Sequence, residues 1–514
     1  MYDTHMRSKL YPYFIYFYVI TIGTIMTKDY AALADTIKIE DITSNKQNQI
    51  ILRRLRNNEK SLDELYIINA SEYAQDDNEY EYNPKEGKDM RWLGHYIGNI
   101  NTKLRRLHFY ITVVNESFYK EISHNKSIKE IHFHGCITSD GKIFPMMTPF
   151  LINNHNLTRI TVEDCLLGDK NIRQLSLAIG DCNKSLKHFD IINSHMGDGQ
   201  LVDLIAILSM YPQLKVLGLE RLAGMRIGRN ECTALASLLS CTTTQLKALN
   251  LKSCYPNSID DEGLETLTNA LAIGHGIREL YLTWNRSITI RGWRSLATLL
   301  EMPGCKLETI DMGSNNIGDD VTQLFANALS SNSTLKKLNL KRNYGITHEG
   351  WASFEKLLCD TSSLNNIYLS NHTLEKVGGM NESTEASACF ELNRLNRSTV
   401  KFRTKEQIAM IKILRNHSHI DMQSFFEWEI KVLPLMITWF EKAATCSKTN
   451  FDTKKVKKMT LGCTYDFIRE FPMLYIEPVT RREIAEYTAK EEELQQGDEL
   501  EEIRQRKARA LKRL

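Results

Sequence analysis

Four histidines and one glutamate are the side chains of this 514-residue chain best suited to metal chemistry, because imidazole nitrogens and carboxylate oxygens are common zinc ligands. They are His108, His132, His134, His188 and Glu163. The motifs G-x-x-x-x-G-K-S/T, G-x-S-x-G, H-E-x-x-H and the EF-hand loop are absent from the sequence. The sequence therefore predicts a protein that is not an enzyme. Whether the histidines can share an ion depends on the elements that carry them.

The composition is that of an ordinary globular protein. Lys and Arg number 65 against 63 Asp and Glu, a net charge of +2, so no global field favours nucleic acid. The 11 cysteines form no C-x-x-C pair, which argues against a disulfide scaffold and against a zinc-finger array. A small-molecule substrate is not expected either, because no catalytic motif is present.

A repeat with the pattern L-x-x-L-x-L-x-x-N/C organises the middle of the chain. Four clear copies begin at Leu246, Ile277, Leu307 and Leu335. Weaker copies begin at Leu104, Ile128, Leu157, Leu186, Leu214 and Leu364, and an isolated copy at Leu62 is expected to open the array. From Ile128 onward the copies lie 28 to 32 residues apart. A fixed period of this length predicts stacked repeats.

Each repeat continues into an amphipathic helix. In one repeat Leu264, Leu267 and Leu271 lie on one helical face, while Glu265 and Asn269 lie on the other. A short strand followed by a helix at this period resembles the ribonuclease-inhibitor type of leucine-rich repeat, over about residues 61–376. The resemblance implies an α/β right-handed solenoid horseshoe, with a parallel sheet inside and helices outside.

Segments outside the repeats suggest further divisions of the chain. Residues 1–27 include 17 uncharged residues from Leu10 to Met26, which fit a membrane anchor, a signal peptide, an ordinary packed helix or an artefact of the gene model. Residues 28–60 are expected to form an N-terminal helical cap. The acidic, tyrosine-rich stretch Asp76–Tyr82 reads as an inserted loop.

The period stops before residues 380–478, which are rich in apolar helix-forming segments. We expect this region to cap the last repeat, or to bind a second partner as a helical domain. Residues 480–514 predict a charged single helix or a weak coiled coil. This order of segments resembles an uncharacterised algal type of ribonuclease-inhibitor-like protein.

The concave face of the predicted solenoid consists of repeat positions 3, 5 and 7, because the apolar residues at positions 1, 4 and 6 build the core. Aromatic side chains beside charged ones are typical of protein-binding patches. The candidate partner-binding residues are Tyr110, His132, His134, Glu163, Asp190, Lys252, Tyr281, Trp284, Asp311, Lys341 and Tyr368. A merely solvated face is the alternative.

The strand geometry limits the metal chemistry of the histidines. His132 and His134 lie about 6.6 Å apart along one strand, and neighbouring strands lie about 4.8 Å apart, so only a subset of the histidines could share one ion. We therefore expect a polar surface, with no bound metal and no cofactor.

The ninth repeat position is expected to be structural. The resemblance implies that its side chain points inward and bonds the backbone of neighbouring loops, with a buried thiol replacing the usual asparagine in some repeats. This ladder comprises Cys136, Cys165, Cys254, Asn285, Asn315 and Asn343.

Taken together, these features predict a non-enzymatic interaction scaffold that binds a protein partner on the concave face. A GTPase-activating regulator and the recognition module of an innate-immunity-like sensor are alternatives from the same repeat type. The expected location is the cytoplasm, unless residues 10–26 anchor the chain in a membrane or direct it to secretion.

Overall fold

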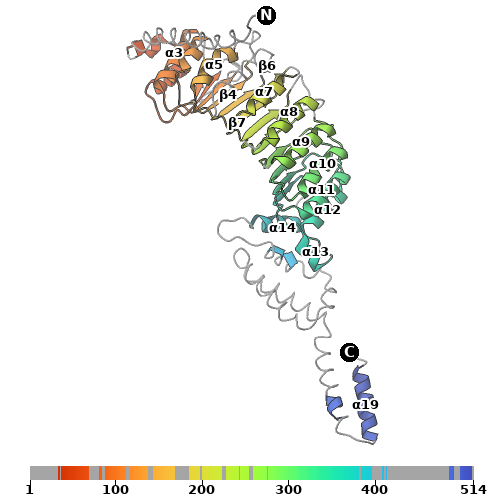
Figure 1. Ribbon diagram of the computed structural model, residues 1–514. Coiled ribbons are helices and arrows are strands. Elements are labelled where there is room, and N and C mark those ends of the chain that lie inside the picture. Colours follow the sequence, from red (N-terminus) through yellow and green to blue (C-terminus); the bar gives the residue numbers. More distant parts are fainter. Residues whose placement is uncertain are drawn as a thin grey trace, which may run out of the picture. The chain divides into compact units, whose positions relative to one another are not determined.

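The computed structural model forms two compact units (Figure 1). The first comprises residues 1–321 and 337–345, and the second residues 322–336 and 346–514. The predicted boundary near residues 376–380 therefore lies inside the second unit. The structure describes residues 33–34, 36–68, 80–83, 87–110, 116–136, 143–167, 185–196, 199–222, 227–241, 244–253, 259–274, 276–380, 384–395, 408–409, 412–413, 486–490 and 498–511. The apolar segment 1–27, Cys254 and most of 380–478 lie outside them.

A parallel sheet runs through the first unit. Its strands follow one another in the order β2-β1-β3-β4-β5-β7-β9-β10-β11-β12-β13. Their bounds are β1 Glu64–Ile68, β2 Glu81–Tyr82, β3 Arg106–Tyr110, β4 Glu130–His134, β5 Arg159–Glu163, β7 His188–Ile192, β9 Val216–Glu220, β10 Ala248–Asn250, β11 Glu279–Tyr281, β12 Thr309–Asp311 and β13 Lys337–Asn339. Two short strands, β6 (Leu166–Leu167) and β8 (His195–Met196), pair separately. The predicted α/β leucine-rich-repeat solenoid is confirmed.

Helices alternate with these strands, and Figure 1 shows α7 to α10 following one another along one side of the sheet. The helices of the first unit are α2 Lys46–Arg56, α3 Gly87–His95, α4 Glu116–Ile122, α5 Ile143–Asn153, α7 Gln200–Leu208, α8 Arg229–Ser240, α9 Asp261–Ile273 and α10 Ile290–Glu301, with short turns η1 Ile39–Asp41 and η2 Tyr96–Ile100. Helix α11 (Asp319–Ser331) crosses from the first unit into the second.

The core lies between the sheet and the helices. In β3, β4, β5 and β7 buried and half-buried residues alternate strictly, as the strand period of two requires. On the helical side Leu264, Leu267 and Leu271 of α9 are buried, and Trp293 of α10 is 1% exposed. The helical spacing read from the sequence thus points these side chains at the strands.

The beginning of the array differs from expectation in one detail. The isolated repeat at Leu62 supplies β1, which pairs with β3 along its whole length. The predicted insertion Asp76–Tyr82 does not remain a loop at its end, because Glu81–Tyr82 forms the edge strand β2. The N–H of Tyr66 donates to the Tyr80 carbonyl at 2.8 Å, and Tyr82 is fully buried. Pairing the exposed edge of β1 explains why this segment becomes a strand.

The last predicted repeat was placed wrongly. Residues Leu364–Leu369 form helix α13, started by the Ser363 hydroxyl, which accepts from the Asn366 N–H at 3.1 Å. The repeat begins instead at Leu374 and gives β14 (Lys376–Gly378), where the N–H groups of Glu375 and Lys376 donate to the Lys336 carbonyl. Tyr368 therefore lies in a helix and not on a concave strand.

An asparagine stands three residues before the first leucine of several repeats, although not of all. The Asn371 side chain accepts from the Thr373 and Leu374 N–H groups at 2.8 Å, and Asn332 does the same before Leu335. Asn125 precedes Ile128 and Asn101 precedes Leu104 in the same way. Leu364 has no asparagine at that place, but neither have Leu214, Leu246, Ile277 and Leu307, which begin true repeats, so this residue alone does not distinguish the helix from the strand.

The second unit also contains α12 (His348–Leu358), α14 (Thr384–Leu395) and α19 (Asp498–Leu511). The fully buried Lys412 ammonium donates to the carbonyls of Leu358, at the end of α12, and of Asn371, at 2.6 and 3.0 Å. Asn393 of α14 donates to Leu374 at 2.7 Å. These contacts supply donors to backbone oxygens around the last repeat.

None of the described helices combines the length and the apolarity that a membrane crossing requires.

Candidate functional site

The fifth repeat positions form one continuous row across the sheet, because the parallel register aligns every strand with its neighbour. From the N-terminal edge the row contains Tyr66, His108, His132, Thr161, Asp190, Gly218, Asn250, Tyr281, Asp311 and Asn339. The seventh positions give a second row with Tyr110, His134 and Glu163 next to one another. Tyr66 is a member that the sequence analysis did not single out.

Aromatic rings crowd the N-terminal part of the concave face. Tyr66 stacks on His108 with ring centroids 4.4 Å apart, and His108 meets His132 edge-on at 5.6 Å. Tyr110 lies 4.9 Å from His134 and 6.0 Å from His132. These ring contacts restrict the orientation of each imidazole.

Two carboxylates face these histidines. Glu64 Oε1 lies 2.9 Å from His108 Nε2, and Glu163 Oε2 lies 3.1 Å from His132 Nε2. Burial nevertheless lowers the pKa of both His108 and His132 below the usual imidazole value, although the neighbouring carboxylates act in the opposite direction.

Asp190 occupies the middle of the row, where its ionised carboxylate lowers the free energy of unfolding. Burial raises its pKa to about 6, against the charge of Arg159 and with a smaller contribution from Glu220. The space for its carboxylate exists because the facing residue is glycine: a Cβ at Gly218 would lie 2.3 Å from Asp190 Oδ1. Gly218 is therefore required for close approach and not for an unusual backbone.

Replacing Asp190 with asparagine is expected to stabilise the protein by about 2 kcal/mol at pH 7. The folded-state pKa of about 6 exceeds the unfolded value of 3.8, so the folded protein with Asp190 loses stability as the pH rises from 4 to 6. The gain of D190N should disappear below pH 4, in urea titrations at pH 7 and pH 3.5. An equal difference at both pH values would contradict the buried-charge explanation.

Side chains in the C-terminal part of the row form hydrogen bonds with nearby backbone groups and with other side chains of the sheet. Asp311 accepts from the Gly313 N–H and from Asn339 Nδ2, both at 2.9 Å. Tyr281 donates to Glu279 at 2.8 Å, and burial together with this bond raises the pKa of Tyr281 to about 12. The backbone N–H groups of the predicted Lys252 and Lys341 donate to the row asparagines Asn250 and Asn339, at 3.1 and 3.2 Å.

Trp284 stands at the eighth repeat position, where the chain turns away from the strand. Its φ of 67° is left-handed, and the Arg286 guanidinium lies 4.4 Å from its ring centroid. The same position is left-handed in most described repeats, at Gly135, Asp164, Asn193, Arg221, Ser314 and Arg342. Glycine, asparagine and aspartate suit this conformation, whereas a bulky tryptophan is strained in it.

The ninth-position side chains reach backward by one repeat. Each donates to the carbonyl of the sixth position of the preceding repeat: Cys136 to Phe109, Cys165 to Phe133, Asn285 to Leu251, Asn315 to Leu282 and Asn343 to Met312. The two sulfur contacts measure 3.6 and 3.9 Å, and the three amide contacts 2.8 to 3.0 Å. Cys254 lies outside the described residues.

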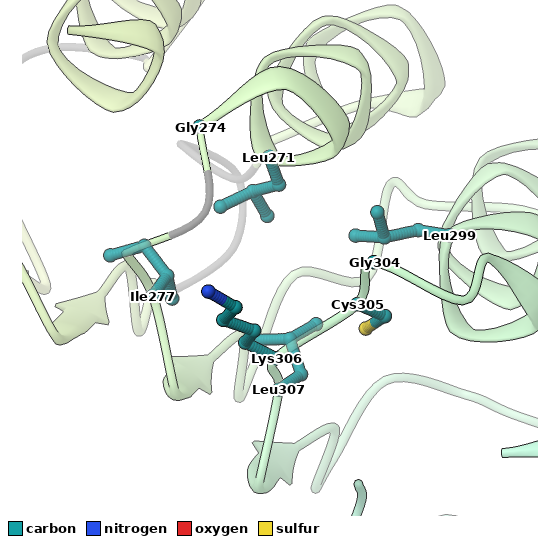
Figure 2. A pocket seen from close by; sticks show the side chains of 8 residues that line it. All are labelled: Leu271, Gly274, Ile277, Leu299, Gly304, Cys305, Lys306 and Leu307. Carbon is teal, nitrogen blue, oxygen red and sulfur yellow. The ribbon is translucent and has the colours of Figure 1, made fainter. Parts of the chain in front are cut away.

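A small recess opens on a different part of the first unit (Figure 2). It is lined by Leu271, Gly274, Ile277, Leu299, Gly304, Cys305, Lys306 and Leu307, and Figure 2 shows the Lys306 side chain extending toward Ile277. This lining contains neither an imidazole nor a carboxylate, so the recess does not compete with the concave face as a functional site.

No protein-family model matches the chain. It is 28% identical over 199 residues to NACHT, LRR and PYD domains-containing protein 4C of Mus musculus, covering 38% of this chain and 19% of that protein. It is 24% identical over 250 residues to the ribonuclease inhibitor of Sus scrofa, covering 43% of this chain and 53% of the inhibitor. The chain thus spans about half, or less, of the length of these curated relatives. Both relatives carry leucine-rich repeats of the ribonuclease-inhibitor type, which confirms the predicted type of repeat.

Solved structures give weaker likenesses. The yeast Rad7 and Elc1 complex matches at 13% identity with a TM-score of 0.30, over 68% of this chain and 96% of that chain. The TLR13–ssRNA13 complex matches at 17% identity with a TM-score of 0.31, over 49% of this chain and 35% of that chain.

Proposed function

We propose that this chain, a solenoid of ribonuclease-inhibitor-like leucine-rich repeats, is a non-enzymatic scaffold that binds a protein partner on its concave face. Its curated relatives are of a class that generally binds proteins or other ligands without catalysis. The contact surface comprises the concave residues of β3 to β13, with Trp284 at its edge.

The observation that carries this proposal is the half-buried carboxylate of Asp190, which stands in the middle of the concave row opposite Gly218. Asp190 lies on the concave side of β7, and burial raises its pKa to about 6, so that ionisation is less favourable than for an aspartate in water. Groups whose pKa is perturbed by burial are often found at binding sites. The proposed partner therefore offers a cation or a hydrogen-bond donor to Asp190, and an apolar group to Tyr281 and Trp284.

Variants of two aromatic residues test this proposal. The full-length protein, and versions with Tyr281→Ala or Trp284→Asn, are used to capture partners from cells, followed by affinity measurements on each captured protein. Both variants are expected to bind at least tenfold more weakly, because aromatic anchors dominate such interfaces. Trp284→Asn should not reduce stability, since asparagine suits a φ of 67°.

Tyr344→Ala is the matched control, because Tyr344 is 91% exposed and lies in the loop after β13. The control should retain every partner of the parent protein. A partner that binds all three variants equally, or that only the Tyr344 variant loses, would place the interface elsewhere.

A recognition module for a sensor is a second candidate, favoured by the 199-residue similarity to the NACHT-containing relative. In this case the captured partner would itself carry a nucleotide-binding domain. If none of the partners that Trp284→Asn fails to capture carries a nucleotide-binding domain, this candidate is eliminated.

A cytoplasmic location accompanies the proposal. It is supported by Cys136, Cys165, Cys232, Cys305 and Cys389, which carry thiols and not disulfides in the described residues, because thiols persist in reducing compartments. Fractionation of cells, with mass spectrometry of the mature N-terminus, tests this location. Recovery of the chain with lumenal or membrane proteins would contradict it.

A further inference from the structure

We propose that His132, His134 and Glu163 form a binding site for a divalent transition-metal ion, with zinc as the expected occupant. One donor atom from each side chain lies within 4.8 Å of the donor atoms of the other two. The site goes beyond the proposed scaffold function and does not depend on it.

The spacing of the donor atoms is close to that of a tetrahedral zinc site. With zinc–ligand distances of about 2.1 Å, two tetrahedral ligands lie about 3.4 Å apart. Glu163 Oε2 lies 3.1 Å from His132 Nε2 and 3.6 Å from His134 Nδ1. Two of the three distances therefore need only small changes. The third, between the two imidazole nitrogens, lies within 4.8 Å and has to shorten to about 3.4 Å when the ion binds.

The fold holds these side chains on rigid elements. His132 and His134 are two residues apart on β4 and so share a face, and β5 places Glu163 directly opposite His134. Tyr110 packs against both imidazoles, with centroids 4.9 and 6.0 Å away. Asp164 Oδ2 lies 3.5 Å from His134 Nδ1 and adds negative charge beside the site. In metalloproteins, ligands are oriented by the rigid elements that carry them and by side chains that pack against them.

The other histidines of the face are not part of the set. His108 Nε2 faces Glu64 at 2.9 Å, and His188 lies on β7, beyond β5. The remaining coordination positions are accessible from solvent, because the side chains of His132, His134 and Glu163 are 20, 26 and 27% exposed. Two histidines and one carboxylate with open positions are a known donor set for zinc and for other divalent metals of the first transition row.

Cobalt titration of the metal-free full-length protein tests the site. Co²⁺ reports its ligands by its visible spectrum, and thiolate ligation adds an intense near-ultraviolet band that a site of two histidines and one glutamate lacks. We expect one equivalent of Co²⁺ to bind without that band and to be displaced by Zn²⁺. His132→Ala and Glu163→Gln should each weaken binding at least tenfold, while His188→Ala should not change it.

Glu163→Gln keeps the side-chain shape, so it remains informative if an alanine variant fails to fold, as checked by circular dichroism. Unchanged stoichiometry and affinity in both ligand variants would overturn the proposal. Binding that shows only the thiolate band would also overturn it, because the ion would then reside on cysteines.

Discussion

Replacing Asn343 with alanine is expected to lower the unfolding free energy by about 4 kcal/mol. The buried Asn343 side chain makes four hydrogen bonds: it donates to the Met312 and Leu340 carbonyls and accepts from the Asn315 and Ile317 N–H groups. Alanine leaves all four backbone groups without this partner in the interior, and each costs about 1 kcal/mol or more. Urea unfolding followed by far-ultraviolet circular dichroism measures the loss.

Asn315→Ala provides the matched control, because it changes the same residue type at the same repeat position. Among the described residues, the Asn315 amide donates to the Leu282 carbonyl alone, and its side-chain oxygen has no hydrogen-bond partner. Leu282 also accepts from Asn285 at 3.0 Å, so no carbonyl is left unpaired. The control should lose about 1 kcal/mol or less. Equal losses of unfolding free energy for the two variants would show that cavity formation, and not hydrogen bonding to the backbone, accounts for the contribution of these asparagines.

The second large effect concerns the buried Lys412, whose neutralisation is expected to stabilise the protein. Burial lowers the pKa of Lys412 to about 8, although the nearby Cys359 and Cys389 thiols act to raise it. The unfolded chain therefore binds an extra proton between pH 8 and the ordinary lysine pKa of 10.5, and stability rises with pH across this window. The shift corresponds to about 3 kcal/mol.

Lys412→Met isolates this titration, since the two proteins share every other ionisable group. The stability advantage of the parent over the variant should grow by up to about 3 kcal/mol between pH 7 and pH 10, in urea titrations followed by tryptophan fluorescence. An advantage that stays constant, or that shrinks with rising pH, would contradict the presence of a buried lysine with a lowered pKa.

The register of the concave row could be predicted from the sequence because a repeat fixes it. Once position 1 of each copy is known, His132, Asp190 and Tyr281 must lie in one line across a parallel sheet, and they do. The row fails only at Tyr368, where Leu364, Ile367 and Leu369 match the repeat pattern but fold as a helix. Apolar residues spaced by three and two residues suit either structure, and the Ser363 cap favours the helix here.

Other features depend on contacts between repeats and were not predictable from one repeat at a time. The raised pKa of Asp190 arises from its burial, in a position that its side chain can occupy because Gly218 on the next strand has no Cβ. The convergence of His132 and His134 on a single oxygen of Glu163 depends on side-chain rotation, which strand spacing does not specify. The strained backbone of Trp284 likewise follows from the shared left-handed turn and not from its residue type.

Site-specific photo-crosslinking in cells tests the central claim, partner binding on the concave face, most directly. A photoreactive phenylalanine analogue replaces either Tyr281, on the concave face, or Glu265, on the exposed face of α9. We predict that position 281 forms covalent adducts with a defined protein partner and that position 265 forms none. Adducts at position 265 without adducts at position 281 would contradict the account and place the partner on the helical side of the solenoid.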